Sequence, residues 1–193
     1  GQGCFLGWSD HPLTARGRAQ AEAAGARLAA LGPMPVLCSD LPRARESAEI
    51  IAARWNVPVE PDARWRELSS GRLEGRPWEE LSADADLAAA LDADPYHTVM
   101  PGGESAAMMM QRAVAAVTEA AARPVPCLVV VAHDGPIRAV LAHVLGIPPT
   151  HFWRLTTRHG GLTHLAVVDG WWYVITTSET GHLAESNVLD KVW

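Results

Sequence analysis

The sequence predicts an α/β fold of three layers, in which helices cover both faces of a mostly parallel mixed sheet. Short apolar runs alternate with segments of helical periodicity along most of the chain, which is typical of strand–helix units. The end of the chain differs, because two apolar runs flank Asp169-Gly170, a dipeptide that favours an antiparallel hairpin. With 48% hydrophobic and 20% charged residues, residues 1–193 are expected to form a single domain.

The first half of the chain supplies a helix, a strand–helix unit and a short extended piece. An alanine-rich segment after Thr14 has apolar residues at helical spacing and ends at Gly32-Pro33. The run Val36-Leu37-Cys38 predicts a short strand, and helical spacing resumes after Ser39-Asp40. Val57-Pro58-Val59 predicts a further extended segment.

The second half is expected to contain helices, one buried strand and the closing hairpin. The predicted helices span residues 78–91, 104–122 and 137–145. The apolar run 127–132 predicts the strand, and the hairpin is expected to join residues 162–168 to residues 172–175.

His133 ends the apolar run and directly precedes a helix. The first turn of a helix has unpaired N–H groups and the positive end of the dipole, so a phosphate is expected there beside His133. Asp134 and Gly135 are expected to line the same site, with Asp134 as a helix cap whose carboxylate points away from the anion. A lone histidine at a strand end is more often a core residue, so this interpretation depends on other candidates.

Three further places in the chain carry candidate chemistry. Arg43 stands near the start of a helix that follows a strand, where its guanidinium could bind phosphate through paired N–H groups. Glu67 lies in a loop rich in glycine and charge, where a carboxyl could protonate a leaving oxygen. The turn before Ser105 is equally consistent with a helix cap and a substrate loop. Taken alone, Arg43 and Glu67 are more often surface residues.

Together and in this order, the motifs resemble the histidine phosphatase superfamily, which has the phosphoglycerate mutase-like fold. The matching motifs are Gly7-Trp8-Ser9-Asp10, Pro12-Leu13-Thr14 with Gly17, Ser39-Asp40-Leu41 with Arg43-Ala44, Arg66-Glu67 with Gly71 and Glu74-Gly75, Pro101-Gly102-Gly103-Glu104-Ser105, His133 with Gly135 and Arg138, and His182-Leu183.

The resemblance implies an enzyme that needs no metal or cofactor and passes a phosphoryl group to a histidine. It implies that Arg43 binds phosphate, that Glu67 is the acid and base, and that His133 is the second active-site histidine, protonated to stabilise the phosphoryl charge. Ser9 is expected to contact the substrate. Only about two dozen residues separate Gly75 from Pro101, which leaves room for a short lid and favours the phosphatase branch, similar to α-ribazole phosphatase.

One signature of the family, Arg-His-Gly with the nucleophilic histidine, ends the fold's first strand shortly before the segment that matches Gly7-Trp8-Ser9-Asp10. The given sequence begins at that point. We therefore expect the nucleophile and an inner strand upstream of Gly1, because without that strand each unpaired buried backbone group would cost about 1–3 kcal/mol. Arg158-His159-Gly160 spells the same signature but precedes a strand instead of following one, so His159 is expected at the edge of the pocket.

Other functions are excluded or left open. The net charge of −6 argues against a nucleic-acid partner, and no apolar run reaches the roughly 18 residues of a membrane span. Cys4, Cys38 and Cys127 are expected to be reduced, which indicates a cytoplasmic protein. The expected partner is a small phosphorylated metabolite, and a homodimer is left open. The alternatives are a catalytically inactive member that binds a phosphorylated ligand or protein, and a mutase.

Overall fold

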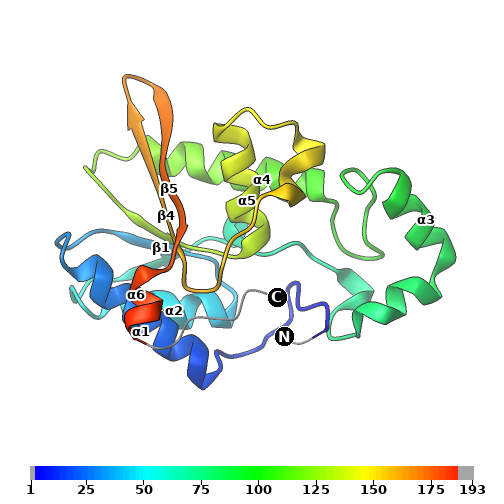
Figure 1. Ribbon diagram of the computed structural model, residues 1–193, viewed down its shortest axis with the longest axis horizontal. Coiled ribbons are helices and arrows are strands. Elements are labelled where there is room, and N and C mark those ends of the chain that lie inside the picture. Colours follow the sequence, from blue (N-terminus) through cyan, green and yellow to red (C-terminus); the bar gives the residue numbers. More distant parts are fainter. Residues whose placement is uncertain (1–2, 187–193) are drawn as a thin grey trace.

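The computed structural model describes residues 3–186, apart from the side chain of residue 185, and has the α/β architecture that the sequence predicts (Figure 1). The longer helices are α1 (Ala15–Ala29), α2 (Pro42–Ala52), α3 (Ala85–Ala93), α4 (Ala106–Ala121) and α5 (Asp134–Val144), and a short α6 (Gly181–Glu185) follows the hairpin. The strands are β1 (Val36–Cys38), β2 (Val59–Pro61), β3 (Val129–Val131), β4 (Leu162–Val168) and β5 (Trp171–Glu179).

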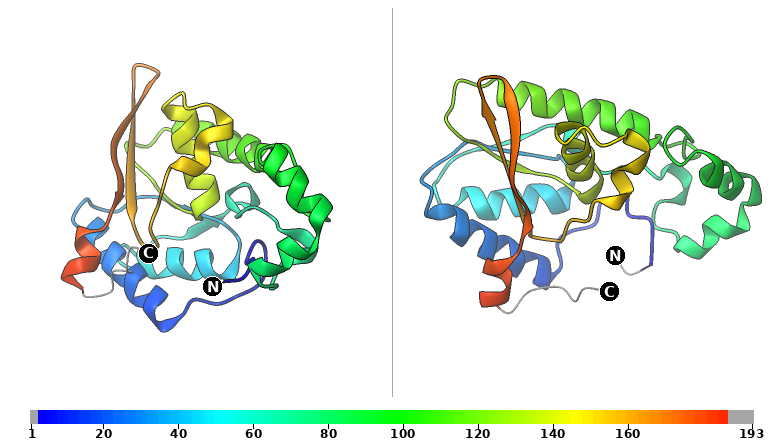
Figure 2. Two further views of the ribbon diagram at one scale, coloured as in Figure 1. Left: turned by 45° about the vertical axis from the view of Figure 1, so that its right-hand side comes forward. Right: turned by 45° about the horizontal axis from the view of Figure 1, so that its top comes forward.

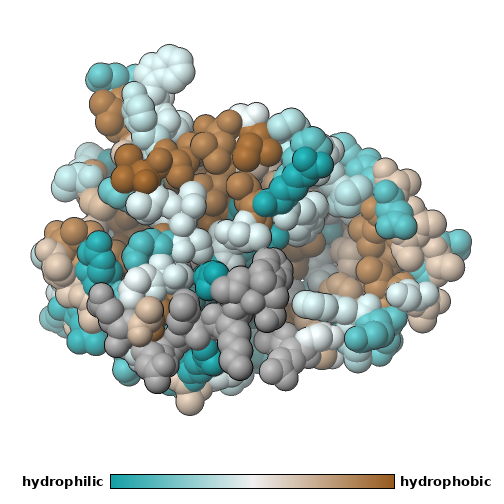
Figure 3. Space-filling view, in the orientation of Figure 1, coloured by the Kyte–Doolittle hydropathy of each residue, from teal (hydrophilic) through white to brown (hydrophobic). Residues whose placement is uncertain are grey.

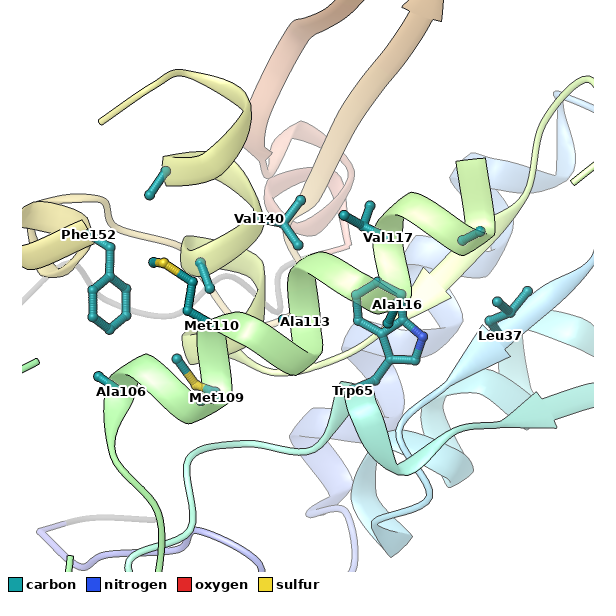
Figure 4. Packing of buried hydrophobic residues seen from close by; sticks show 13 residues of the cluster. Leu37, Trp65, Ala106, Met109, Met110, Ala113, Ala116, Val117, Val140 and Phe152 are labelled. Carbon is teal, nitrogen blue, oxygen red and sulfur yellow. The ribbon is translucent and has the colours of Figure 1, made fainter. Parts of the chain in front are cut away.

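Strand β1 lies at the centre of a parallel sheet with the order β2-β1-β3. Its side chains alternate between two cores, as the pleat of a strand requires. Leu37 packs into the core under α4 and α5, where Trp65 also lies (Figure 4), whereas Val36 and Cys38 pack against α2. Figure 2 shows α1 and α2 on one side of the strands and α4 and α5 on the other. The predicted three layers are confirmed.

The sheet differs from the expected single mixed sheet, because β4 and β5 form a separate antiparallel sheet among the described residues. Strand β3 is bonded to β1 along one edge, through Val129 N to Pro35 O and Ser39 N to Val131 O. Leu165 of β4 and Val130 of β3 border the same core, but the described residues give β3 and β4 no ladder between them. Figure 3 shows apolar surface beside the base of the projecting hairpin.

Local signals placed most of the elements correctly. The Thr14 hydroxyl accepts from Gly17 N at 3.1 Å, and Ser105 caps α4 by accepting from Met108 N at 3.3 Å, so the turn before α4 is a helix cap. Asp169 and Gly170 both have positive φ, 51° and 79°, as the two central residues of a type I′ hairpin turn require.

Two predicted helices have different bounds. The helix expected over residues 78–91 is split into a 3₁₀ turn, Trp78–Ala83, and α3, because Asp84 caps α3 by accepting from Leu87 N at 3.0 Å. Helix α5 begins at Asp134 rather than at Ile137, since Pro136 lacks an N–H and is tolerated in a first turn. Among the described residues no helix is both long enough and apolar enough to cross a membrane.

Candidate active site

His133 lies where β3 ends and is the residue that precedes the first turn of α5. Its Nε2 lies 2.9 Å from the hydroxyl oxygen of Ser39, which follows the neighbouring strand β1. Burial, together with the positive charges of Arg43 and Arg112, lowers the pKa of His133 to about 3. Both effects favour the neutral form of the His133 ring at pH 7, whereas the family resemblance implied a protonated ring.

Arg43 reaches the site from the first turn of α2. Its Nη1 donates to Ser9 O at 3.0 Å and its Nη2 to Gly7 O at 2.7 Å, so the loop after the N-terminus fixes the guanidinium. Burial lowers the pKa of Arg43, whereas the charge of Glu67 raises it. An arginine remains charged throughout the physiological range and has five N–H donors, so further donors remain for an anion.

Glu67 completes the predicted catalytic group from the loop after Trp65. Its Oε1 accepts from Leu68 N at 2.8 Å, and its Oε2 accepts from Gly135 N at 3.2 Å, two residues after His133. Burial raises the pKa of Glu67 above that of an ordinary carboxyl, and the charge of Arg43 opposes this shift. The sheet thus brings Arg43, Glu67 and His133 within one electrostatic environment.

Gly135 is where α5 approaches Glu67 most closely. A Cβ at this position would lie 2.2 Å from Glu67 Oε1 and 2.7 Å from Met109 Sδ, so a side chain here would displace the Glu67 carboxylate and the Met109 sulfur. Gly135 therefore contributes its backbone N–H and its lack of a side chain. The sequence predicted that Gly135 lies at the site, but not that it contacts Glu67.

Arg112 and Glu104 hold the Glu67 loop from α4 and its N-terminal turn, and sequence reasoning missed this role. Arg112 donates to the backbone oxygens of Arg64, Arg66 and Glu67, the first at 2.9 Å and the last at 2.8 Å. It also pairs with Glu104, which accepts from Ser69 N at 3.1 Å. Both charged side chains are largely buried. Glu104 and Arg112 are separated by two helical turns in the sequence, and this spacing was the signal that could have revealed the pair.

Trp8 and Arg66 form a second unforeseen group beside the catalytic residues. The Arg66 guanidinium lies over the Trp8 ring, 4.7 Å from its centroid, and binds both oxygens of Asp40 at 2.6 and 2.5 Å. Trp8 Nε1 donates to Glu67 O at 2.6 Å, and Trp8 N donates to Glu74 at 2.9 Å. The indole therefore ties the Gly7–Ser9 loop to the loop that carries Glu67.

The remaining predicted contacts are placed differently. Ser9 lies at the site through its carbonyl, while its hydroxyl donates to Leu6 O at 2.5 Å. Asp134 is not the helix cap; its carboxylate binds Arg138 at 2.7 and 2.6 Å and accepts from Thr157. The negative charge of Asp134 is therefore paired with Arg138. His159 is exposed in the turn before β4. Among the described residues, no cluster of three acidic, histidine or cysteine side chains could hold a metal ion.

A histidine, an arginine and a glutamate thus lie together at the carboxyl ends of parallel strands and in the adjoining loops of an α/β fold. Over residues 1–180 the chain matches the Histidine phosphatase superfamily (branch 1). A protein of Erwinia tasmaniensis named probable phosphoglycerate mutase GpmB is 33% identical over 194 residues, which cover 96% of this chain and 89% of the relative. The chain belongs to the histidine phosphatase superfamily, as its motifs predicted.

Solved structures agree with this assignment. YhfR of Bacillus stearothermophilus has a TM-score of 0.85 at 27% identity, and the similarity covers 94% of this chain and 92% of that one. The α-ribazole phosphatase of Shigella flexneri has a TM-score of 0.83 at 25% identity, with 92% and 89% covered. The phosphoglycerate mutase-like fold predicted from the sequence is therefore confirmed.

Proposed function

We propose that this protein is a metal-independent phosphomonoester hydrolase that acts through a phosphohistidine on a small phosphorylated metabolite. The observation that carries the proposal is the convergence of Arg43, Glu67 and His133 in one buried environment. The similarity to an α-ribazole phosphatase supports hydrolysis of a small monoester. The three cysteines are free thiols, which fits a cytoplasmic location.

In the first step, the nucleophilic histidine forms an N–P bond while the P–O bond to the alcohol breaks. Arg43 and His133 bind the phosphoryl oxygens, where negative charge is concentrated. Glu67 gives its proton to the departing oxygen, and burial favours this role because it holds the pKa of Glu67 above the ordinary range.

In the second step, the Glu67 carboxylate takes a proton from water as the water oxygen attacks phosphorus. The N–P bond breaks, and inorganic phosphate and the free histidine are released. Glu67 then carries its proton again, so one carboxyl serves both steps. The N–H groups of Leu68 and Gly135 hold the carboxylate in place when it is charged.

We place the nucleophilic histidine at the end of a strand upstream of Gly1, between β3 and β4. The valines of β3 are half-exposed, although β1 beside them is fully buried, and an apolar strand edge of this kind is normally paired or covered. Strands β3 and β4 border the same core without pairing with each other. A strand between them would join the two sheets into the single mixed sheet that the sequence predicts.

Amide hydrogen exchange tests this placement. Val129 N and Val131 O face β1, so the N–H of Val130 points to the opposite edge of β3. We expect the Val130 amide to exchange quickly in the 193-residue chain and slowly in a chain extended to its native start. The Val129 amide, which is bonded to Pro35, is the control and should be protected in both. Equal protection of Val130 in the two chains would contradict the placement.

The proposed reaction is tested by hydrolysis of p-nitrophenyl phosphate with EDTA present. We expect activity in the extended chain, none in the 193-residue chain, and a large loss in the extended chain with His133→Ala. Activity in the short chain would refute an upstream nucleophile and direct attention to His159. Inactivity of all three with phosphate still bound would favour the inactive, ligand-binding alternative.

The role of Glu67 is tested by changing the leaving group. Glu67→Gln removes the acid, so kcat/KM for an alkyl phosphate should fall about 10²–10⁴-fold. The loss should be much smaller for p-nitrophenyl phosphate, whose leaving group needs little protonation. Equal losses for the two substrates would contradict the acid role.

A mutase is the second candidate, because the Erwinia relative is named a probable phosphoglycerate mutase. A mutase returns the phosphoryl group to a second hydroxyl instead of to water. Incubation with 3-phosphoglycerate, followed by ³¹P NMR, separates the two reactions. We expect inorganic phosphate to accumulate, and an isomeric phosphoglycerate as the main product would favour the mutase.

A further inference from the structure

Ser39 lies directly after β1 and is fully buried. Its backbone N–H donates to Val131 O at 2.9 Å, which links the end of β1 to the end of β3. Its side-chain oxygen accepts from Leu41 N at 3.2 Å and lies 2.9 Å from Nε2 of His133. The hydroxyl is thus fixed by both strands at the point where they deliver Arg43 and His133.

The bonds of this hydroxyl determine where the hydrogen of the His133 ring lies. A hydroxyl has one hydrogen to donate and two lone pairs to accept with. One lone pair is used by Leu41 N–H. Among the described residues, Nε2 of His133 is the acceptor within reach of the hydroxyl hydrogen. If Nε2 carried a hydrogen, the buried hydroxyl would face two donors and its own hydrogen would lack a partner, which is costly in a buried position.

We propose that Ser39 is a positioning residue that keeps His133 in the tautomer with its hydrogen on Nδ1, so that the neutral ring donates a hydrogen bond to a phosphoryl oxygen. The inference rests on the proposed phosphatase function for the identity of this ligand. The tautomer itself follows from the bonds in the ligand-free site and can be measured without turnover.

This role resolves a conflict between the expected and the observed state of His133. The family resemblance implied a positive ring that stabilises the phosphoryl charge, but the buried ring beside Arg43 and Arg112 is neutral. A neutral ring can still bind an anion, provided that its single hydrogen is on the nitrogen that faces the ligand. Arg43 supplies the charge, and His133 supplies a directed donor with no proton uptake.

The tautomer is read from the ¹⁵N chemical shifts of the His133 ring in the extended protein labelled with ¹⁵N-histidine. The signal is assigned by its loss in His133→Gln. We expect a protonated Nδ1 and an unprotonated Nε2 in the wild type, and a mixture or a reversal in Ser39→Ala. Ser39→Thr keeps the hydroxyl and should restore the wild-type pattern. Ser47→Ala is the control, since its hydroxyl donates to Arg43 O at 2.8 Å and not to a ring.

Binding of inorganic phosphate gives the second measurement. Ser39→Ala should weaken it about three- to tenfold, the effect of one misdirected hydrogen bond, while Ser39→Thr should recover most of the affinity. A hydrogen on Nε2 in the wild type, protonation of both ring nitrogens, or an unchanged tautomer in folded Ser39→Ala would overturn the proposal. The expected tautomer without phosphatase activity would instead refute the proposed function and leave the role of Ser39 intact.

Discussion

The end of β3 and the turn before β4 each present a histidine within two residues of a glycine, yet the two regions have opposite surroundings. At the end of β3, the His133 side chain is only partly exposed, lies 2.9 Å from the hydroxyl oxygen of Ser39 and interacts with the charges of Arg43 and Arg112. In the turn, His159 belongs to an Arg-His-Gly triplet that spells the family signature, but its side chain is exposed. The two regions show that the environment of a histidine depends on where its motif lies in the fold. A position after a strand brings it close to residues from neighbouring strands and loops.

The largest effect should come from the support of the Glu67 loop, which lies against the first turn after His133. Arg112→Met removes the guanidinium that binds three backbone oxygens and leaves Glu104 as an uncompensated buried charge, so the free energy of unfolding should fall by about 3–5 kcal/mol. Urea unfolding measures this change in the free energy of unfolding. Arg123→Met is the control, because its ion pair with Glu60 is exposed and should contribute little to the free energy of unfolding. If the free energy of unfolding fell by similar amounts in Arg112→Met and Arg123→Met, the Arg112–Glu104 pair would be no more important for stability than an exposed ion pair.

The second-largest effect should be on catalysis, in which His133 and His159 are expected to differ. His133→Gln in the extended chain should lower kcat/KM for p-nitrophenyl phosphate about 10²–10³-fold, because a flexible amide replaces the fixed ring N–H that donates to the phosphoryl group. Steady-state kinetics with a thermal unfolding check separates this loss from a loss of fold. A loss below about threefold would show that the buried position of His133 has no catalytic consequence.

Stability should depend on pH through His133. Its pKa is about 3 in the folded protein and near 6.5 when unfolded, so between these values the unfolded chain binds a proton that the folded chain does not. Stability should therefore fall as the pH is lowered from about 6.5 toward 3. Thermal unfolding across this range should show a flatter slope for His133→Gln, and an identical slope in both proteins would contradict a neutral buried ring.

The smallest effect is expected at the turn. His159→Gln should change kcat/KM less than about threefold, because an exposed side chain in this turn contributes little to binding the phosphoryl group. The same assay with the extended chain measures this. A loss as large as that of His133→Gln would reverse the comparison and make His159 a catalytic residue.

Periodicity and turn chemistry were sufficient to predict the layers and the hairpin, since these depend on local sequence. Arg43, Glu67 and His133 could be selected because their motifs occur in a family order. The bonds from Arg112 to the Glu67 loop and the Ser39–His133 bond could not be predicted, because they join residues brought together by packing alone. The same reason explains Asp134, whose partner Thr157 lies far along the chain.

The way in which Arg112 and Glu104 bind the Glu67 loop has a consequence for how this site can diversify. They contact backbone atoms of the loop, the oxygens of Arg64, Arg66 and Glu67 and the N–H of Ser69, and none of its side chains. Residues outside the loop, Arg112 and Glu104, therefore hold its backbone in place. Side chains of the loop can therefore be exchanged while the backbone that carries Glu67 keeps its path, because the bonds that hold this path are made to peptide groups.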